Sequence, residues 1–119
     1  RLTTVAAATF DPVETQLAAY NARDIETFLS CYTDTCVVED GEGNRLLSGY
    51  EQMRVRYETL FADSPKLHAD VMHRTRIGRY VIDEEVISGR VPDLRRAIAI
   101  YRIDAATGLI EHVRFLREE

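Results

Sequence analysis

The sequence has few cysteines, and they lie in no pattern typical of a bridge or a metal site. Cys31 and Cys36 are the only two in 119 residues, with no CxxC pair and no histidine at zinc-ligand spacing. Such a pair is typical of free, buried thiols. We therefore expect no disulfide and no bound metal.

Clustered positive charge is also missing. The 15 lysine and arginine residues are scattered among 20 aspartate and glutamate residues, and the formal net charge is −5. Binding to phosphate backbones requires grouped basic side chains. The composition therefore argues against a nucleic-acid partner.

No apolar run is long enough for a membrane span. The longest uncharged stretch of the N-terminal region is "LTTVAAATF", far short of the roughly 20 residues that a spanning helix needs. It also lacks the long apolar region of a signal peptide. We predict no membrane partner and a cytoplasmic location.

Several catalytic motifs are absent as well. The sequence has no glycine-rich phosphate loop after a strand, no HExxH motif, and no Ser-His-Asp or Cys-His pattern with a family context. Phosphate transfer, acyl-enzyme chemistry and zinc hydrolysis are therefore unsupported. We expect chemistry without a cofactor, if there is any.

The first half of the chain has the pattern of three helices. We predict an N-terminal tail over residues 1–10 and a single domain over 11–119. Helices are expected to start after the caps Asp11 and Asp24, and a third after the Ser48-x-x-Glu51 pattern. A short strand over residues 36–40, followed by "GEGN", separates the second helix from the third.

The second half changes to a period of two. Four strand-length runs, at 67–77, 79–88, 94–104 and 109–118, are separated by Gly, Pro or "AATG" turns. Consecutive strands without helices between them predict an antiparallel sheet, so the fold class is α+β. In the run 94–104, Ile98 and Ile100 make the face opposite Ala97, Ala99 and Tyr101 apolar too, which predicts a homodimer through the sheet's outer face.

The order of elements, with "YNARDIETFLSCYTD", "VVED" and "SGYEQMRVRY", resembles the NTF2-like superfamily, in its SnoaL-like and ketosteroid isomerase branch. The resemblance covers Asp11 to about Leu116. It implies a cone in which three helices pack on a strongly bent, mainly antiparallel sheet and enclose one pocket for a small apolar or aromatic ligand. The superfamily includes enzymes and proteins without catalysis, so the fold does not define the function.

The same resemblance suggests individual site residues. In ketosteroid isomerases an Asp at the end of the "VED" strand shuttles the proton, which places the general base at Asp40. The positions of the two oxyanion donors, a Tyr and an Asp, are occupied by Gln16 and Ala99. Tyr32 and Tyr57 match supporting tyrosines, and a helical turn beyond Gln16, Tyr20 is a further candidate ligand contact.

Three consecutive acids interrupt the apolar strand "VIDEEVI". Asp83 and Glu85 share one face with Val81 and Ile87, and the resemblance favours this face as pocket-facing. Crowded carboxylates raise the pKa of at least one of them, as acid/base chemistry requires. The alternative is that these acids pair with arginines of neighbouring strands, such as Arg74.

Three further residues are candidates for the pocket. His73 alternates with Val71 and Thr75 and is a possible acid/base partner, as in dehydratase-like relatives, or a structural histidine. Tyr101 and Phe115 line either the pocket or the core.

Two functions therefore remain open. One is cofactor-free proton transfer of the isomerase or cyclase type with Asp40 as the base. The other is a non-catalytic ligand-binding or dimerisation module, and a weaker third option is protein binding through the sheet, as in nuclear transport relatives.

Overall fold

The computed structural model describes residues 10–118 of the chain. The tail predicted over residues 1–10 lies, Phe10 apart, outside them. Three helices precede most of the sheet: α1 (Pro12–Ala22), α2 (Ile25–Ser30) and α3 (Tyr50–Asp63). The strands are β1 (Tyr32–Asp40), β2 (Arg45–Ser48), β3 (His68–Ile77), β4 (Tyr80–Ser88), β5 (Arg96–Ile103) and β6 (Ile110–Arg117).

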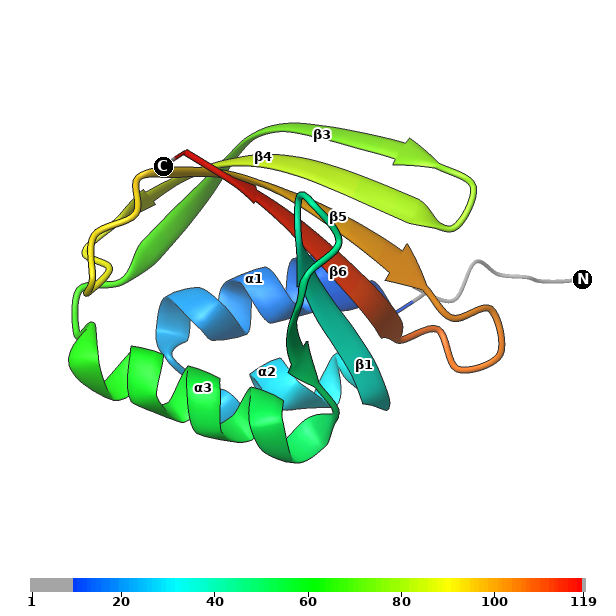
Figure 1. Ribbon diagram of the computed structural model, residues 1–119, viewed down its shortest axis with the longest axis horizontal. Coiled ribbons are helices and arrows are strands. Elements are labelled where there is room, and N and C mark those ends of the chain that lie inside the picture. The colour runs from blue at the N-terminus through cyan, green and yellow to red at the C-terminus, as the bar shows by residue number, and fades with distance from the viewer. Residues whose placement is uncertain (1–9, 119) are drawn as a thin grey trace, which may run out of the picture.

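The six strands form one sheet in the order β2-β1-β6-β5-β4-β3. All neighbours are antiparallel except β1 and β6, which run parallel. The sheet bends over the three helices, which lie against its concave side (Figure 1). This arrangement confirms the predicted α+β fold of three helices on a bent, mainly antiparallel sheet.

Side-chain caps start the first two helices as expected. The Asp11 carboxylate accepts hydrogen bonds from the Val13 and Glu14 amides, and the Asp24 carboxylate accepts one from Thr27. Each bond satisfies an amide that has no partner inside the helix. Both predicted caps are confirmed.

The start of α3 differs from the prediction. Ser48 belongs to β2, and the cap residue of α3 is Gly49, which makes no side-chain cap bond. The Ser48 amide donates to the Gln52 side chain instead, at 2.8 Å. The Ser-x-x-Glu pattern therefore indicates where α3 begins but not its cap, because Ser48 is the last residue of β2.

An aromatic cluster centred on Phe28 joins the helices to the sheet. Its ring centroid lies 4.5 Å from that of Tyr57 and 5.0 Å from that of Tyr32. Tyr20 and Phe61 complete the cluster, with centroids 6.2 and 5.6 Å from Phe28. Tilted and edge-on ring contacts at these distances are favourable, and they form the floor on which the functional site is built.

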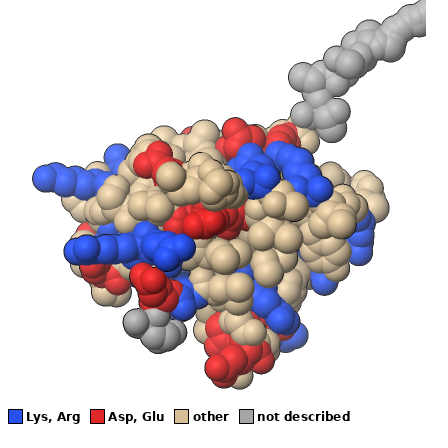
Figure 2. Space-filling model, turned by 90° about the horizontal axis from the view of Figure 1, so that it is seen from above, with Lys and Arg blue, Asp and Glu red and all other residues tan. Residues whose placement is uncertain are grey.

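The outer face of the sheet carries apolar and charged side chains together. Val86 and Leu116 are 39% and 38% exposed there, beside the half-buried Ile98 and Ile100. Figure 2 shows acidic and basic side chains interspersed with uncharged surface over the upper side of the molecule. The predicted homodimer through this face stays a prediction.

In residues 10–118, no helix combines the length and apolar composition needed to cross a membrane.

Candidate functional site

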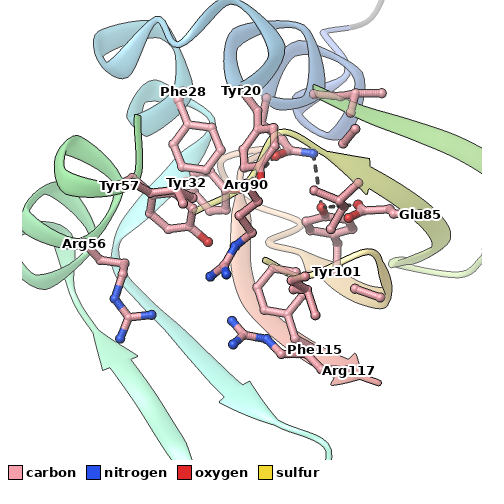
Figure 3. Close-up of a pocket in the computed structure, with 17 residues that line it drawn as sticks. Tyr20, Phe28, Tyr32, Arg56, Tyr57, Glu85, Arg90, Tyr101, Phe115 and Arg117 are labelled. Carbon is pink, nitrogen blue, oxygen red and sulfur yellow. Dashed lines mark hydrogen bonds between the residues drawn. The ribbon is translucent and has the colours of Figure 1, made fainter. Parts of the chain in front are cut away.

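A cavity opens between the helices and the concave side of the sheet (Figure 3). Its volume is about 60 Å³. This space suits a single ring better than a four-ring steroid.

Most of the lining is aromatic or aliphatic, and five polar residues interrupt it. The apolar and aromatic residues are Leu17, Tyr20, Phe28, Tyr32, Tyr57, Leu60, Ala69, Ile87, Leu94, Ala97, Tyr101 and Phe115. The others are Gln16, Arg56, Glu85, Arg90 and Arg117. An apolar cavity with a few converging polar groups is the usual form of a small-molecule site.

A chain of hydrogen bonds ends on Glu85. The Tyr32 hydroxyl donates to Gln16 Oε1, and Gln16 Nε2 donates to the Tyr101 hydroxyl, both at 3.1 Å. The Tyr101 hydroxyl in turn donates to Glu85 Oε2 at 3.5 Å. Gln16 Nε2 also donates to the Val13 carbonyl at 3.0 Å, so both ends of this amide are occupied within the protein.

The Glu85 side chain has the environment of an acid/base group. Glu85 is 7% exposed, and among the described residues it forms no ion pair. Burial, followed by the nearby Asp83 carboxylate, raises the pKa of Glu85 to about 7. A carboxyl group with this pKa can both accept and release a proton near neutral pH.

Asp83 is buried, but it is paired with an arginine and does not face the cavity as predicted. Arg74 Nε and Nη2 bind the two Asp83 carboxylate oxygens at 2.6 and 2.9 Å, and Arg74 also pairs with Glu14 of α1. The Asp83 side chain is fully buried, and it is not among the residues that line the cavity. Each of the two alternatives therefore holds for one acid: Asp83 is paired with an arginine, and Glu85 faces the cavity.

Two tyrosine hydroxyls at the cavity are free to bind a ligand. Within residues 10–118, no hydrogen-bond partner is found for the hydroxyl groups of Tyr20 and Tyr57. Burial raises the pKa of Tyr57 to about 12 and moves that of Tyr20 upward as well. Both hydroxyls therefore stay protonated at neutral pH and can donate.

Three arginines lie at the mouth of the cavity, and the sequence pattern does not indicate them. Arg56 lies on α3, Arg90 in the loop after β4, and Arg117 at the end of β6 (Figure 3). The one available signal was that Arg117 alternates with Phe115 on β6. The other two come close only because the sheet bends over α3.

Asp40 does not line the cavity, and the predicted pocket-facing orientation is wrong. Its carboxylate accepts hydrogen bonds from the Glu42 and Asn44 amides and from Asn44 Nδ2, each at 2.9 Å. These bonds, the Asn44 side chain first, lower the pKa of Asp40. The turn "GEGN" thus binds the carboxylate that the family resemblance assigned to catalysis. Its neighbour Glu39 pairs with His112 and Arg114.

His73 also lies outside the cavity. The pairing of β3 with β4 shifts register between Val71 and His73, where Met72 is the extra residue. A bulge of this kind reverses the side-chain alternation that follows it. His73 is therefore exposed, and Arg74 takes the inward position.

The remaining predicted residues divide as follows. Gln16, Tyr20, Tyr32, Tyr57, Glu85, Tyr101 and Phe115 line the cavity, and Asp40, His73, Asp83 and Ala99 do not. Ala99 is fully buried in the core, opposite Asp83 on β4 and Phe115 on β6.

Replacing Asp40 tests its assignment to the turn. We expect Asp40→Ala to lower the midpoint of thermal unfolding slightly, because three hydrogen bonds of the turn are lost. Asp40→Asn should lower it less, since an amide oxygen still accepts in such turns. Differential scanning fluorimetry measures both. A larger loss for Asn than for Ala would contradict the assignment.

Comparison with known proteins places this fold in a family. The model of the SnoaL-like domain family matches residues 13–113. No curated protein matches the chain.

Three solved structures illustrate the likeness. An uncharacterised cystatin-fold protein from Novosphingobium aromaticivorans is 25% identical and has a TM-score of 0.78, with 89% of this chain and 95% of that chain covered. An NTF2-like protein of unknown function from Cytophaga hutchinsonii is 16% identical, with a TM-score of 0.76 and coverage of 98% and 95%. A protein with a ketosteroid isomerase-like fold from Catenulispora acidiphila, solved with trimethylamine, is 17% identical, with a TM-score of 0.71 and coverage of 91% and 85%.

Proposed function

This chain belongs to the SnoaL-like domain family, and on that basis we propose that its cavity binds a small organic molecule and transfers a proton on it without a cofactor. In this proposal Glu85 replaces Asp40 as the general base. The substrate is a compact carbonyl compound whose acidic C–H group lies against Glu85.

The observation that carries the proposal is the state of Glu85. It is a buried carboxyl group at the cavity, and its one direct hydrogen bond among the described residues comes from Tyr101 at 3.5 Å. A base is most effective when its pKa lies near the working pH. The pKa of Glu85, about 7, meets this condition, whereas the turn lowers the pKa of Asp40.

The oxygen of an enolate would be stabilised by hydroxyl donors. Tyr57 and Tyr20 both line the cavity, and their hydroxyl groups have no partner in residues 10–118. One oxyanion donor is typically worth about 100- to 1,000-fold in rate. In our proposal these two tyrosines donate hydrogen bonds to the enolate oxygen, a role that residues at other positions have in ketosteroid isomerases.

A non-catalytic ligand-binding module is the second candidate. Gln16, at the position of the usual oxyanion tyrosine, uses both ends of its amide within the protein, and Ala99 has no polar side-chain atom to offer. A family member that has lost these donors can retain the cavity and bind without turnover. The two candidates differ in whether a bound ketone exchanges its protons.

Proton exchange tests the choice directly. We expect the protein to accelerate the exchange of the acidic C–H protons of a small aromatic ketone, such as phenylacetone or 2-tetralone, in D₂O, followed by ¹H NMR. Glu85→Gln should reduce this acceleration by at least about 100-fold, because the amide cannot accept the proton. The rate of exchange should rise as the pH increases through about 7, because Glu85 ionises there.

The matched control is Glu84→Gln. Glu84 is the adjacent acid on the outer face of β4, where it pairs with Arg96. This variant should leave the exchange rate unchanged, as should Asp40→Asn. If no ketone of the panel exchanges faster than in buffer, the binding module is favoured. If Glu85→Gln retains the acceleration, Glu85 is not the base.

We also propose that the protein is a homodimer through the outer face of the sheet. The exposed Val86 and Leu116, with the half-buried Ile98 and Ile100, support it, because they form apolar surface that a partner can cover. The cytoplasmic location stays a prediction from the sequence.

A further inference from the structure

Three guanidinium groups lie together at the mouth of the cavity. Arg56, Arg90 and Arg117 come from a helix, a loop and a strand end, and Figure 3 shows their guanidinium groups on the same side of the cavity. The Arg117 guanidinium carbon also lies 5.8 Å from the centroid of the Phe115 ring. A ligand in the cavity can therefore contact a group of positive charges.

Within residues 10–118, these arginines form none of the carboxylate pairs that most other arginines form. Among the thirteen arginines in residues 10–118, eight form ion pairs with described carboxylates: Arg54, Arg74, Arg76, Arg79, Arg95, Arg96, Arg102 and Arg114. Three of the remaining five gather at this mouth. In a chain with a formal charge of −5, carboxylates are abundant, so a group of arginines that pair with none of the described ones is a favourable place for negative charge.

Electrostatics at the mouth favour an incoming anion. Burial, and next the positive charge of Arg117, lower the pKa of Arg90. The carboxylate that lines the cavity, Glu85, is hydrogen bonded to Tyr101 and forms no ion pair with these arginines. A bound anion would remove the repulsion between the guanidinium groups and accept their hydrogen bonds.

The loop that carries Arg90 is fixed in place. Gly89 has a φ of +71°, and a Cβ atom there would lie 2.1 Å from the Lys66 carbonyl oxygen, so a side chain does not fit. The Val91 amide donates to the fully buried Ser64 hydroxyl at 2.9 Å. Arg90 Nη1 itself donates to the Pro92 carbonyl at 2.6 Å. The guanidinium is thus oriented before any ligand arrives.

We propose that the ligand is a small organic anion, with its ring or chain in the aromatic part of the cavity and its anionic group bound by Arg90 and Arg117 at the mouth. Arg56 adds a third positive charge. The planar fork of arginine matches both carboxylate and phosphate oxygens. This inference rests on the proposed function only in that the cavity is the ligand site, and it requires no role for Glu85 as a base.

Binding measurements with matched probes test this inference. Isothermal titration at low salt would compare benzoate and phenyl phosphate, two anions, with benzamide, a neutral molecule of the shape of benzoate. We expect at least one anion to bind about tenfold or more tightly than benzamide. The affinity of that anion should fall as salt is added. Whichever anion binds more tightly identifies the group as carboxylate or phosphate.

Variants then assign the binding to the mouth. Arg90→Met and Arg117→Met, each tested alone, should weaken binding of the anion about tenfold and leave binding of benzamide unchanged. Arg95→Met is the matched control: it removes the same charge from the same loop, but Arg95 is exposed and paired with Asp93. Thermal unfolding of each variant monitors the fold.

The inference is overturned if neither anion binds at millimolar concentration, if benzamide binds as tightly as both anions, or if anion binding persists in both folded arginine variants. The test of anion binding and the test of Glu85 as the base can fail independently. Loss of proton exchange in the absence of any change in anion binding would concern Glu85 alone, and the reverse result would concern the arginines alone.

Discussion

Arg74→Met is expected to destabilise the protein by about 3–5 kcal/mol, the cost of leaving a buried charge without its partner. Arg74 binds both oxygens of Asp83, which is fully buried, and also pairs with Glu14. The side chain thus joins β3, β4 and α1. Methionine fills similar space but leaves the Asp83 carboxylate in a site that cannot solvate it.

Urea unfolding of the wild type and the variant measures this loss. The control is Arg76→Met, two residues along β3, where the pair with Asp11 is half exposed and its removal should cost at most about 1 kcal/mol. Arg74→Met combined with Asp83→Asn should recover part of the loss, since the amide carries no charge. A loss as small as that of the control would contradict the stabilising role of the Arg74–Asp83 pair.

Ionisation of Glu85 is expected to lower the free energy of unfolding by about 3 kcal/mol as the pH rises, the equivalent of its pKa shift. The folded-state pKa is about 7, above the ordinary value of 4.5, so the folded state holds a proton that the unfolded chain releases first. Its contribution to stability is fully present below pH 4.5 and is lost as the pH rises through 7. Glu85→Gln cannot ionise and should escape the loss.

The measurement is the difference in unfolding free energy between the wild type and Glu85→Gln at about pH 5 and about pH 8. The free energy of unfolding of the variant should increase relative to that of the wild type toward the higher pH. The contributions of other titrating groups cancel in the comparison. Glu84→Gln, with its half-exposed pair, should show no such gain. An unchanged difference at the two pH values would place the pKa of Glu85 near its ordinary range.

The sequence predicted those features that depend on local pattern. Alternation along "VIDEEVI" placed Asp83 and Glu85 together on one face of their strand, and the aspartate caps marked the starts of α1 and α2. The family resemblance, which the family match confirms, supplied the bent sheet and the cavity. Such signals lie within a few residues of one another or in the order of elements.

The errors arose where one local event redirected a side chain. A single extra residue at Met72 turned His73 outward, and the turn after β1 captured the carboxylate of Asp40. Neither event alters the hydrophobic pattern. The arginines of the mouth are separated by 34 and 27 positions along the chain, and only the bend of the sheet over α3 brings Arg56, Arg90 and Arg117 together.

The tyrosines of the cavity also give the protein a built-in optical reporter. It contains no tryptophan, and four of its six tyrosines, Tyr20, Tyr32, Tyr57 and Tyr101, line the cavity. The ultraviolet emission of the protein therefore comes largely from rings that a ligand would touch. Quenching of that emission can follow ligand entry without a label, on the unmodified chain.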